Sequence, residues 1–126
     1  MNFDKYSIYA PALVRVSLSL VFLWFGVNQL IDAETFIGYV PDFLGEYAST
    51  LVLLNGIFET FFGLLLIVGY YTRFVAAVLG FHLLSIAAGL GYNDIAVRDY
   101  GLALITFSVV LGGSDVWCLD KKLHQV

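Results

Sequence analysis

The chain has 126 residues, of which 60% are hydrophobic and only 13% are charged, and its formal net charge at pH 7 is −4. A soluble domain is about 45–50% apolar and about 25% charged, and so small a soluble protein could not bury this much apolar surface. The composition excludes a cytosolic α/β enzyme and a disordered tail. The acidic balance, with no basic stripe, also excludes a nucleic-acid-binding protein. A single cysteine, Cys118, excludes an intrachain disulfide and a cysteine-based zinc site.

Four segments have the length and hydropathy of membrane-spanning helices, which need about 20 mainly apolar residues. We expect spans at about residues 12–31, 50–70, 74–92 and 95–113. The fourth is the weakest, because it reaches this length only with two charged residues at its mouth. Strands are excluded, since the apolar runs do not alternate and a lipid-exposed strand leaves backbone groups unpaired. The sequence therefore predicts an all-α integral membrane protein, a single four-helix bundle over residues 1–126.

The connections between the spans differ greatly in length. The first, residues 32–49, is long and rich in aromatic side chains, and Pro41 and Asp42 interrupt it. It is either an interfacial segment that rests on the mouth of the bundle or a lid over an external pocket. The second, from Tyr70 to Arg73, is so short that the second and third spans must be neighbouring antiparallel helices.

Basic residues predict how the bundle lies in the membrane. With four spans, both termini are on one side, and that side holds most of the basic residues: Lys5, Arg73, Lys121 and Lys122. The other side holds one basic residue, Arg98, among six acids: Asp32, Glu34, Asp42, Glu46, Asp94 and Asp99. The positive-inside rule then places both termini in the cytoplasm and residues 32–49 outside. We expect a cytoplasmic-membrane protein with residues 114–126 as a cytoplasmic tail.

Polar residues within the spans fall on common helix faces. The face of the first span contains Arg15, Ser19, Phe22, Gly26 and Gln29. That of the second contains Asn55, Gly56, Glu59 and Gly63, and that of the third contains Val75, Val78, His82, Ile86 and Gly89. Polar groups are costly in lipid, and small residues allow close helix approach. These faces are expected to point into the bundle.

Glu59 and His82 are the candidate catalytic residues. Counted from the short hairpin at about 1.5 Å per residue, they lie within about 3 Å of the same depth. We expect a hydrogen bond between them, the alternative being that His82 binds a carbonyl or hydroxyl group elsewhere. A carboxyl group that exchanges a proton at this depth suits a proton relay or a quinol site. The alternative is a structural acid that joins helices.

The candidate binding residues are Arg15, Gln29, Asn55, Arg98 and Asp99. Arg15 lies one turn inside the first span, and we expect it to extend to the lipid headgroups, although its helix face leaves an inward role open. The other four lie at similar depth near the outer mouth. Arg98 suits an anion or a carboxylate, and Asp99 suits the charge of a helix N-terminus. Their directions differ by about 100°, so they are not expected to face one spot. No histidine spacing predicts an intrinsic metal or haem.

Three stretches together have a recognisable pattern: ALVRVSLSLVFLWFGVNQL, NGIFETFFGLLLIVGYYTRFVAAVL and VRDYGLALITFSVVLGGSDVWCLD. From Pro11 to Asp120, the chain resembles the DoxX family of small four-helix membrane proteins. The residues that carry the resemblance are Arg15, Gly26, Glu59, Gly63, Thr72, Arg73, Arg98, Asp99, Trp117, Leu119 and Asp120. The chain departs from the family at Phe25, where many members have a histidine.

The resemblance implies a membrane component of a redox system, similar in some relatives to a subunit of thiosulfate:quinone oxidoreductase. The chain would have no intrinsic cofactor, quinone would be its ligand and a soluble oxidoreductase its partner. A second hypothesis is a non-catalytic scaffold that anchors a soluble partner. A third is a small proton-coupled transporter, although the chain lacks the inverted repeat typical of one. A homo-oligomer is expected because four helices bury only a thin core.

Overall fold

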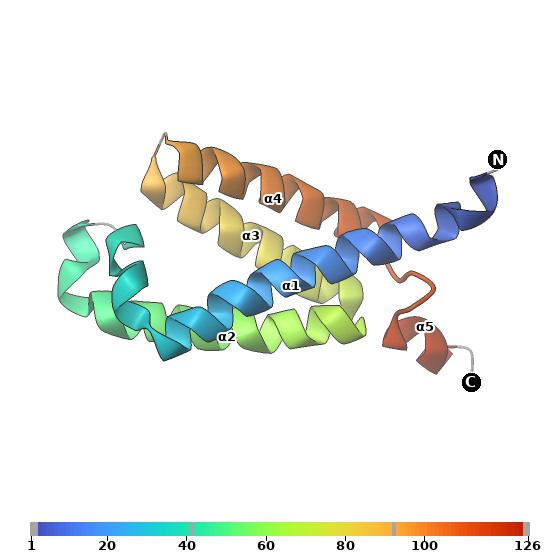
Figure 1. Ribbon diagram of the computed structural model, residues 1–126, viewed down its shortest axis with the longest axis horizontal. Coiled ribbons are helices and arrows are strands. Elements are labelled where there is room, and N and C mark those ends of the chain that lie inside the picture. The colour runs from blue at the N-terminus through green and yellow to red at the C-terminus, as the bar shows by residue number, and fades with distance from the viewer. Residues whose placement is uncertain (1–2, 41, 92, 125–126) are drawn as a thin grey trace.

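The computed structural model describes residues 3–40, 42–91 and 93–124, and these form helices joined by short connections (Figure 1). The long helices are α1 (Ala10–Ile31), α2 (Ala48–Val68), α3 (Thr72–Leu90) and α4 (Asp94–Gly112). Each is long and apolar enough to cross a membrane. The short ones are the 3-10 helices η1 (Asp4–Tyr9), η2 (Ala33–Tyr39) and η3 (Asp42–Tyr47), and α5 (Leu119–His124). The prediction of an all-α membrane protein with four spanning helices is confirmed.

Local signals explain where the helices begin and end. Pro11 lies in the first turn of α1, where its missing N–H group costs nothing. Gly69 follows α2 with φ 75°, and its N–H donates to the Leu65 and Leu66 carbonyls, while the Tyr70 N–H donates to Leu65 O at 3.0 Å. This left-handed termination needs glycine. Both α2 and α3 begin and end two residues earlier than the spans expected at about residues 50–70 and 74–92.

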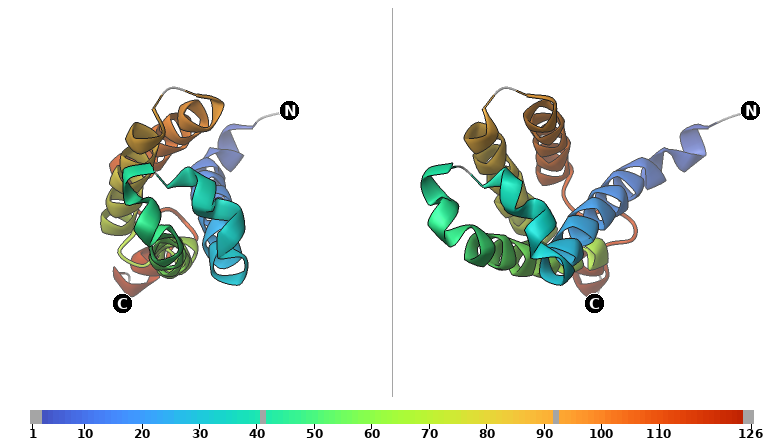
Figure 2. Two further views of the ribbon diagram at one scale, coloured as in Figure 1. Left: turned by 90° about the vertical axis from the view of Figure 1, so that its left-hand side faces the viewer. Right: turned by 60° about the vertical axis from the view of Figure 1, so that its left-hand side comes forward.

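The helices pack as two pairs. α1 packs along α2 and α3 packs along α4, whereas contacts between the pairs are sparse. Figure 2 shows the pairs diverging away from the turn between α2 and α3. The prediction that the second and third spans are neighbours is therefore correct at their turn but wrong for the main packing. The tight turn fixes only one end of each helix and leaves the rest free to separate.

Glycine allows α1 and α2 to pack so closely. A Cβ at Gly26 would lie 2.5 Å from Oγ1 of Thr60 and 2.8 Å from its backbone N. A Cβ at Gly56 would lie 3.0 Å from the Gly26 carbonyl oxygen. Helix backbones in membranes approach in this way through small residues. The faces expected to point inward on the first and second spans form this contact, and Arg15, Gly26, Gln29, Gly56 and Glu59 are all buried.

The face expected to point inward on the third span requires a correction. The α3 residues that pack most deeply are Val75, Ala76, Leu79, Leu83 and Ala87. His82, Ile86 and Gly89 instead line a cavity between the helix pairs. α3 thus has two inward sides, one against α4 and one against the cavity, and a single stripe cannot describe both.

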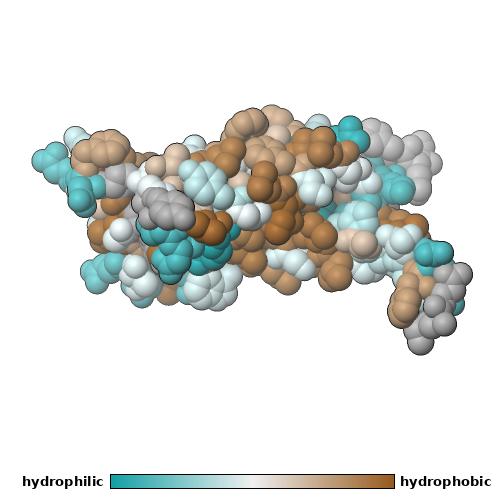
Figure 3. All heavy atoms as spheres, turned by 90° about the horizontal axis from the view of Figure 1, so that it is seen from above, coloured by the Kyte–Doolittle hydropathy of each residue, from teal (hydrophilic) through white to brown (hydrophobic). Residues whose placement is uncertain are grey.

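The two ends of the bundle differ. The terminal end, where α1 begins and α4 ends, carries both described chain ends, and the loop end carries η2 and η3 (Figure 1). Brown apolar side chains cover the middle of the face drawn in Figure 3, and teal polar ones gather toward its ends. This distribution fits a protein surrounded by lipid. Pro41, expected to interrupt the first connection, lies outside the described residues.

Candidate functional site

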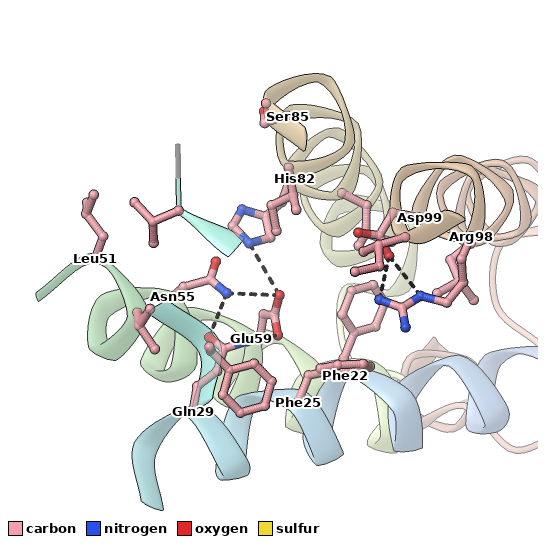
Figure 4. Close-up of a pocket in the computed structure, with 18 of the residues that line it drawn as sticks. Phe22, Phe25, Gln29, Leu51, Asn55, Glu59, His82, Ser85, Arg98 and Asp99 are labelled. Carbon is pink, nitrogen blue, oxygen red and sulfur yellow. Dashed lines mark hydrogen bonds and ion pairs between the residues drawn. The ribbon is translucent and has the colours of Figure 1, made fainter. Parts of the chain in front are cut away.

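A cavity of about 540 Å³ lies between the two helix pairs toward the loop end (Figure 4). Side chains from all four long helices line it, and η2 and η3 contribute its roof. Small-molecule sites usually occupy about 300–1,000 Å³ and have mainly apolar walls with a few polar groups. This cavity has that character. Six of the seven candidate site residues line it: Gln29, Asn55, Glu59, His82, Arg98 and Asp99.

One wall carries a hydrogen-bonded cluster from α1 and α2. Nδ2 of Asn55 donates to Oε1 of Gln29 at 2.7 Å and to Oε1 of Glu59 at 3.2 Å. Nε2 of Gln29 donates to Oε2 of Glu59 at 3.4 Å. Both Gln29 and Glu59 are buried. The cluster holds the Glu59 carboxyl group at the edge of the cavity, with an amide donor to each oxygen.

His82 approaches the same carboxyl group from α3. Its Nε2 lies 3.5 Å from Oε1 of Glu59, and its ring lies 4.4 Å from that of Phe58 between centroids. The contact lacks hydrogen-bond geometry, and Nε2 is buried with no hydrogen-bond partner among the described residues. The helical rise thus correctly places the two residues at one depth, but the expected hydrogen bond is not formed. A buried polar atom without a partner is rare and points to a role beyond packing.

Arg98 and Asp99 form the opposite wall, from α4. Nη2 and Nε of Arg98 donate to Oδ1 of Asp99 at 3.3 and 3.4 Å. The guanidinium group also lies over the Phe25 ring, 5.3 Å from its centroid. The expectation that these residues face different directions is therefore wrong. Their Cβ atoms diverge, but the long arginine side chain folds back along the helix.

The first connection roofs the cavity. Phe36 of η2 is buried and lies 6.2 Å from Phe25 between ring centroids. Val40 and two apolar residues of η3, Phe43 and Leu44, complete the roof. The described parts of the first connection, η2 with Val40 and η3, therefore lie where a lid would lie, over the loop end of the cavity.

Arg15 is the one candidate residue that does not line the cavity, and its expected extension to the headgroups is wrong. Its side chain is 1% exposed, and Nε donates to Oδ2 of Asp115 at 2.7 Å. Its Nη1 donates to the carbonyl oxygens of Leu66 and Ile67, both at 2.7 Å. Asp115 was not identified from the sequence, although an acid just after Gly113 is a plausible partner for an arginine within the span. The carboxylate and two carbonyls satisfy Arg15 inside the protein.

The segment after α4 packs onto the bundle. Burial raises the pKa of Asp115, but hydrogen bonds from Arg15 and from the Trp117 N–H, with the charge of Arg15, hold it below its ordinary value. Oδ1 and Oδ2 of Asp120 accept from the N–H groups of Tyr71 and Thr72, each at 2.7 Å, and cap α3. The segment expected to be a tail thus begins folded against the bundle. We call the residues of this contact the terminal clasp: Arg15 and Thr72 from the bundle, and Asp115, Cys118 and Asp120 from the segment after α4.

Comparison with known proteins agrees with this architecture. The DoxX family model matches residues 10–91, more than half of the chain. Neither a curated protein nor a solved structure gave a match. The matched region contains α1 to α3 with Arg15, Gly26 and Glu59, the residues that form the clasp, the close helix contact and the cavity wall. This chain therefore belongs to the DoxX family.

Proposed function

We propose that the chain is the membrane subunit of a redox system and that its cavity binds the headgroup of a quinone. The observation that carries the proposal is Nε2 of His82, which lies 3.5 Å from Oε1 of Glu59 at the cavity wall and has no hydrogen-bond partner among the described residues. Burying such an atom costs free energy, and a ligand that accepts a hydrogen bond from it would recover that cost. The family resemblance points to the same chemistry.

The residues present fit a quinone. A quinone is a flat ring with carbonyl acceptors, and the cavity offers aromatic walls from Phe22 and Phe25 and, at Nε2 of His82, a buried donor without a partner among the described residues. On reduction, a bound quinone takes up two electrons and two protons. His82 would donate a hydrogen bond to a carbonyl oxygen and orient the ring. Phe25 adds apolar surface where many relatives have a histidine, so this chain relies on His82 for that hydrogen bond.

Glu59 is the group that would hold one of the two protons that quinone reduction requires. Its Oε1 and Oε2 both accept hydrogen bonds, from Asn55 and Gln29. When the carboxyl group takes a proton, one oxygen becomes a donor and must turn from its amide partner. The nearest alternative acceptor is a ligand in the cavity or a neutral His82. Proton uptake and ligand contact are thereby coupled through one side chain.

The electrons would come from a soluble oxidoreductase partner. We place the protein in the cytoplasmic membrane with both termini inside, as the basic residues of the terminal end indicate. The acidic loop end would then face outward, with the roof of the cavity closest to an external partner. A second copy of the chain is a further expected partner in the membrane.

The proposal is tested on protein isolated from native membranes in mild detergent. Quinone is extracted and quantified per chain, and co-isolated proteins are identified by mass spectrometry. We expect bound quinone in the wild type and about tenfold less in His82→Leu, because the ligand loses its donor. Glu59→Gln should keep the quinone but slow its reduction by the co-isolated partner. Thr106→Val is the matched control, because it removes a buried hydroxyl outside the cavity that bonds only within α4.

Two outcomes would overturn the proposal. The first is a wild-type protein without quinone, also after loading with added quinone. The second is equal quinone content in His82→Leu and Thr106→Val. A soluble partner that co-isolates without quinone, and stays bound to the Glu59→Gln and His82→Leu proteins, would instead favour the anchoring scaffold.

A further inference from the structure

The cavity has two sides between the helix pairs, one between α1 and α4 and one between α2 and α3, because the pairs touch only sparsely. Between α1 and α4, Phe25 meets Arg98 across the gap, with the guanidinium group 5.3 Å from the ring centroid. A cation over an aromatic face is a favourable contact, and it is stronger away from water. Figure 4 shows Phe25 and Arg98 reaching from the two helices. On this side a long charged side chain and an aromatic ring therefore span the gap between the helices.

The side between α2 and α3 is different. Here Leu51 and Asn55 on α2 lie opposite Ser85 and Gly89 on α3, and all four line the cavity. Ser85 and Gly89 are also exposed at the surface. An exposed lining residue with a very short side chain leaves room for a path from the cavity to the surface. The α3 edge of this opening is therefore built from two of the smallest side chains, one helical turn apart.

The opening suits hydrocarbon rather than water. Oγ of Ser85 donates to the Phe81 carbonyl at 3.1 Å, so its hydrogen is used within α3. Leu51 and Ile86 supply the neighbouring surface. Ser85 and Gly89 lie three and seven residues beyond His82, which places the opening about 4 to 10 Å closer to the loop end. This stretch is the last part of the apolar span Thr72–Gly89, next to the loop end.

We infer, on the basis of the proposed function, that the ligand is a long-tailed, bilayer-soluble quinone whose tail leaves the cavity between α2 and α3. The headgroup lies against His82 and Glu59, and the tail passes over Ser85 and Gly89 into the lipid. The ligand class is thus an amphiphile with a flat acceptor headgroup and an unbranched or isoprenoid tail. The small side chains of the opening are its specificity determinants, because larger ones would fill the path of the tail.

The test compares two quinones on full-length protein in detergent micelles. The probes are decylubiquinone and the same methoxy-substituted benzoquinone ring without a tail. Trp24 reports binding through quenching of its fluorescence, since its ring lies 4.9 Å from that of Phe25 at the cavity wall. The background substitution Trp117→Phe leaves Trp24 as the single tryptophan of the chain.

Ser85→Phe and Gly89→Phe are the test variants, and Ala88→Phe is the matched control, exposed on the same helix but not part of the cavity lining. We expect each test variant to weaken binding of the tailed quinone by about tenfold, as overpacking does, with tail-less binding unchanged. The control should bind both probes like the parent. A larger effect of Ala88→Phe, an equal loss of both probes in the test variants, or unchanged binding of the tailed quinone would overturn the inference. A parent protein that binds neither probe would refute the proposed function itself, whereas binding of the tail-less probe alone would overturn only the tail path.

Discussion

The terminal clasp is expected to open when Asp115 loses its charge. In Asp115→Asn, Arg15 stays buried opposite a neutral side chain. The Asp115 side chain is only 2% exposed, so solvent does not screen the pair. Removing one partner of a buried ion pair costs about 3–5 kcal/mol. Asparagine keeps an oxygen for the Trp117 N–H, and Arg15 keeps both carbonyl contacts, so we expect the lower end, about 3 kcal/mol.

Cys118 provides the assay. It is the single cysteine of the chain, it is 0% exposed, and its Sγ accepts from the Asp115 N–H at 3.3 Å. A thiol reagent reaches it only when the clasp opens, so the labelling rate follows the opening equilibrium when reclosing is fast. A loss of about 3 kcal/mol corresponds to labelling faster by roughly a hundredfold.

The control for this experiment is Glu46→Gln, which neutralises an exposed acid at the loop end and should label like the wild type. Unchanged labelling in Asp115→Asn would refute the reasoning, because the ion pair would then contribute nothing to closure. Equal acceleration in both variants would also refute it, since net charge rather than the buried pair would be responsible.

Three further predictions follow from the packing and the charges. Gly26→Ala should destabilise the protein by about 1–3 kcal/mol in detergent-induced unfolding, because the added Cβ meets the Thr60 backbone. The control Gly101→Ala places its Cβ in open space and should not destabilise the protein, so equal effects of the two substitutions would contradict the prediction. Asp120→Ala should reduce the stability of the terminal clasp by about 1–2 kcal/mol, because the N-terminus of α3 loses its cap. Cys118 should then be labelled faster, and a labelling rate equal to that of the wild type would contradict the prediction. Because the folded-state pKa of Asp115 lies below its ordinary 3.8, its contribution is complete above that value and is lost as the pH falls through the folded pKa. Labelling with a dipyridyl disulfide should therefore accelerate in acid for the wild type, and an identical acid response in Asp115→Asn would contradict this.

Sequence reasoning predicted the fold well, because lipid leaves a long apolar segment few choices besides helix. It also placed Glu59 and His82 together, since a tight turn and a constant helical rise fix relative depth. It could not predict how the helices pair. The turn at Gly69 joins α2 to α3, but the glycines of α1 and α2 decide which faces pack closely, and that depends on contacts across the chain.

The errors at Arg15 and Arg98 have one cause. The Arg98 prediction took its helix position as its direction, and the Arg15 prediction extended the side chain to the lipid headgroups. Arg15 is held by Asp115, which lies 100 residues away in the sequence, and Arg98 folds back onto its neighbour Asp99. A long, flexible side chain goes to the nearest carboxylate that the tertiary structure offers. Helical spacing alone gives the position of its Cβ atom and not the position of its charge.

The position of Asp115 in the chain has a consequence for how the protein is made. Gln29, Asn55 and Glu59 satisfy one another within α1 and α2, so this hairpin carries its own polar partners into the bilayer. Arg15 enters with the same hairpin, but ribosomes reach its carboxylate only after α3 and α4. Membrane insertion of this protein therefore passes through a stage in which Arg15 lies in the bilayer before Asp115, its counter-ion, has been synthesised. Synthesis of residue 115 then locks the first helix to the last span.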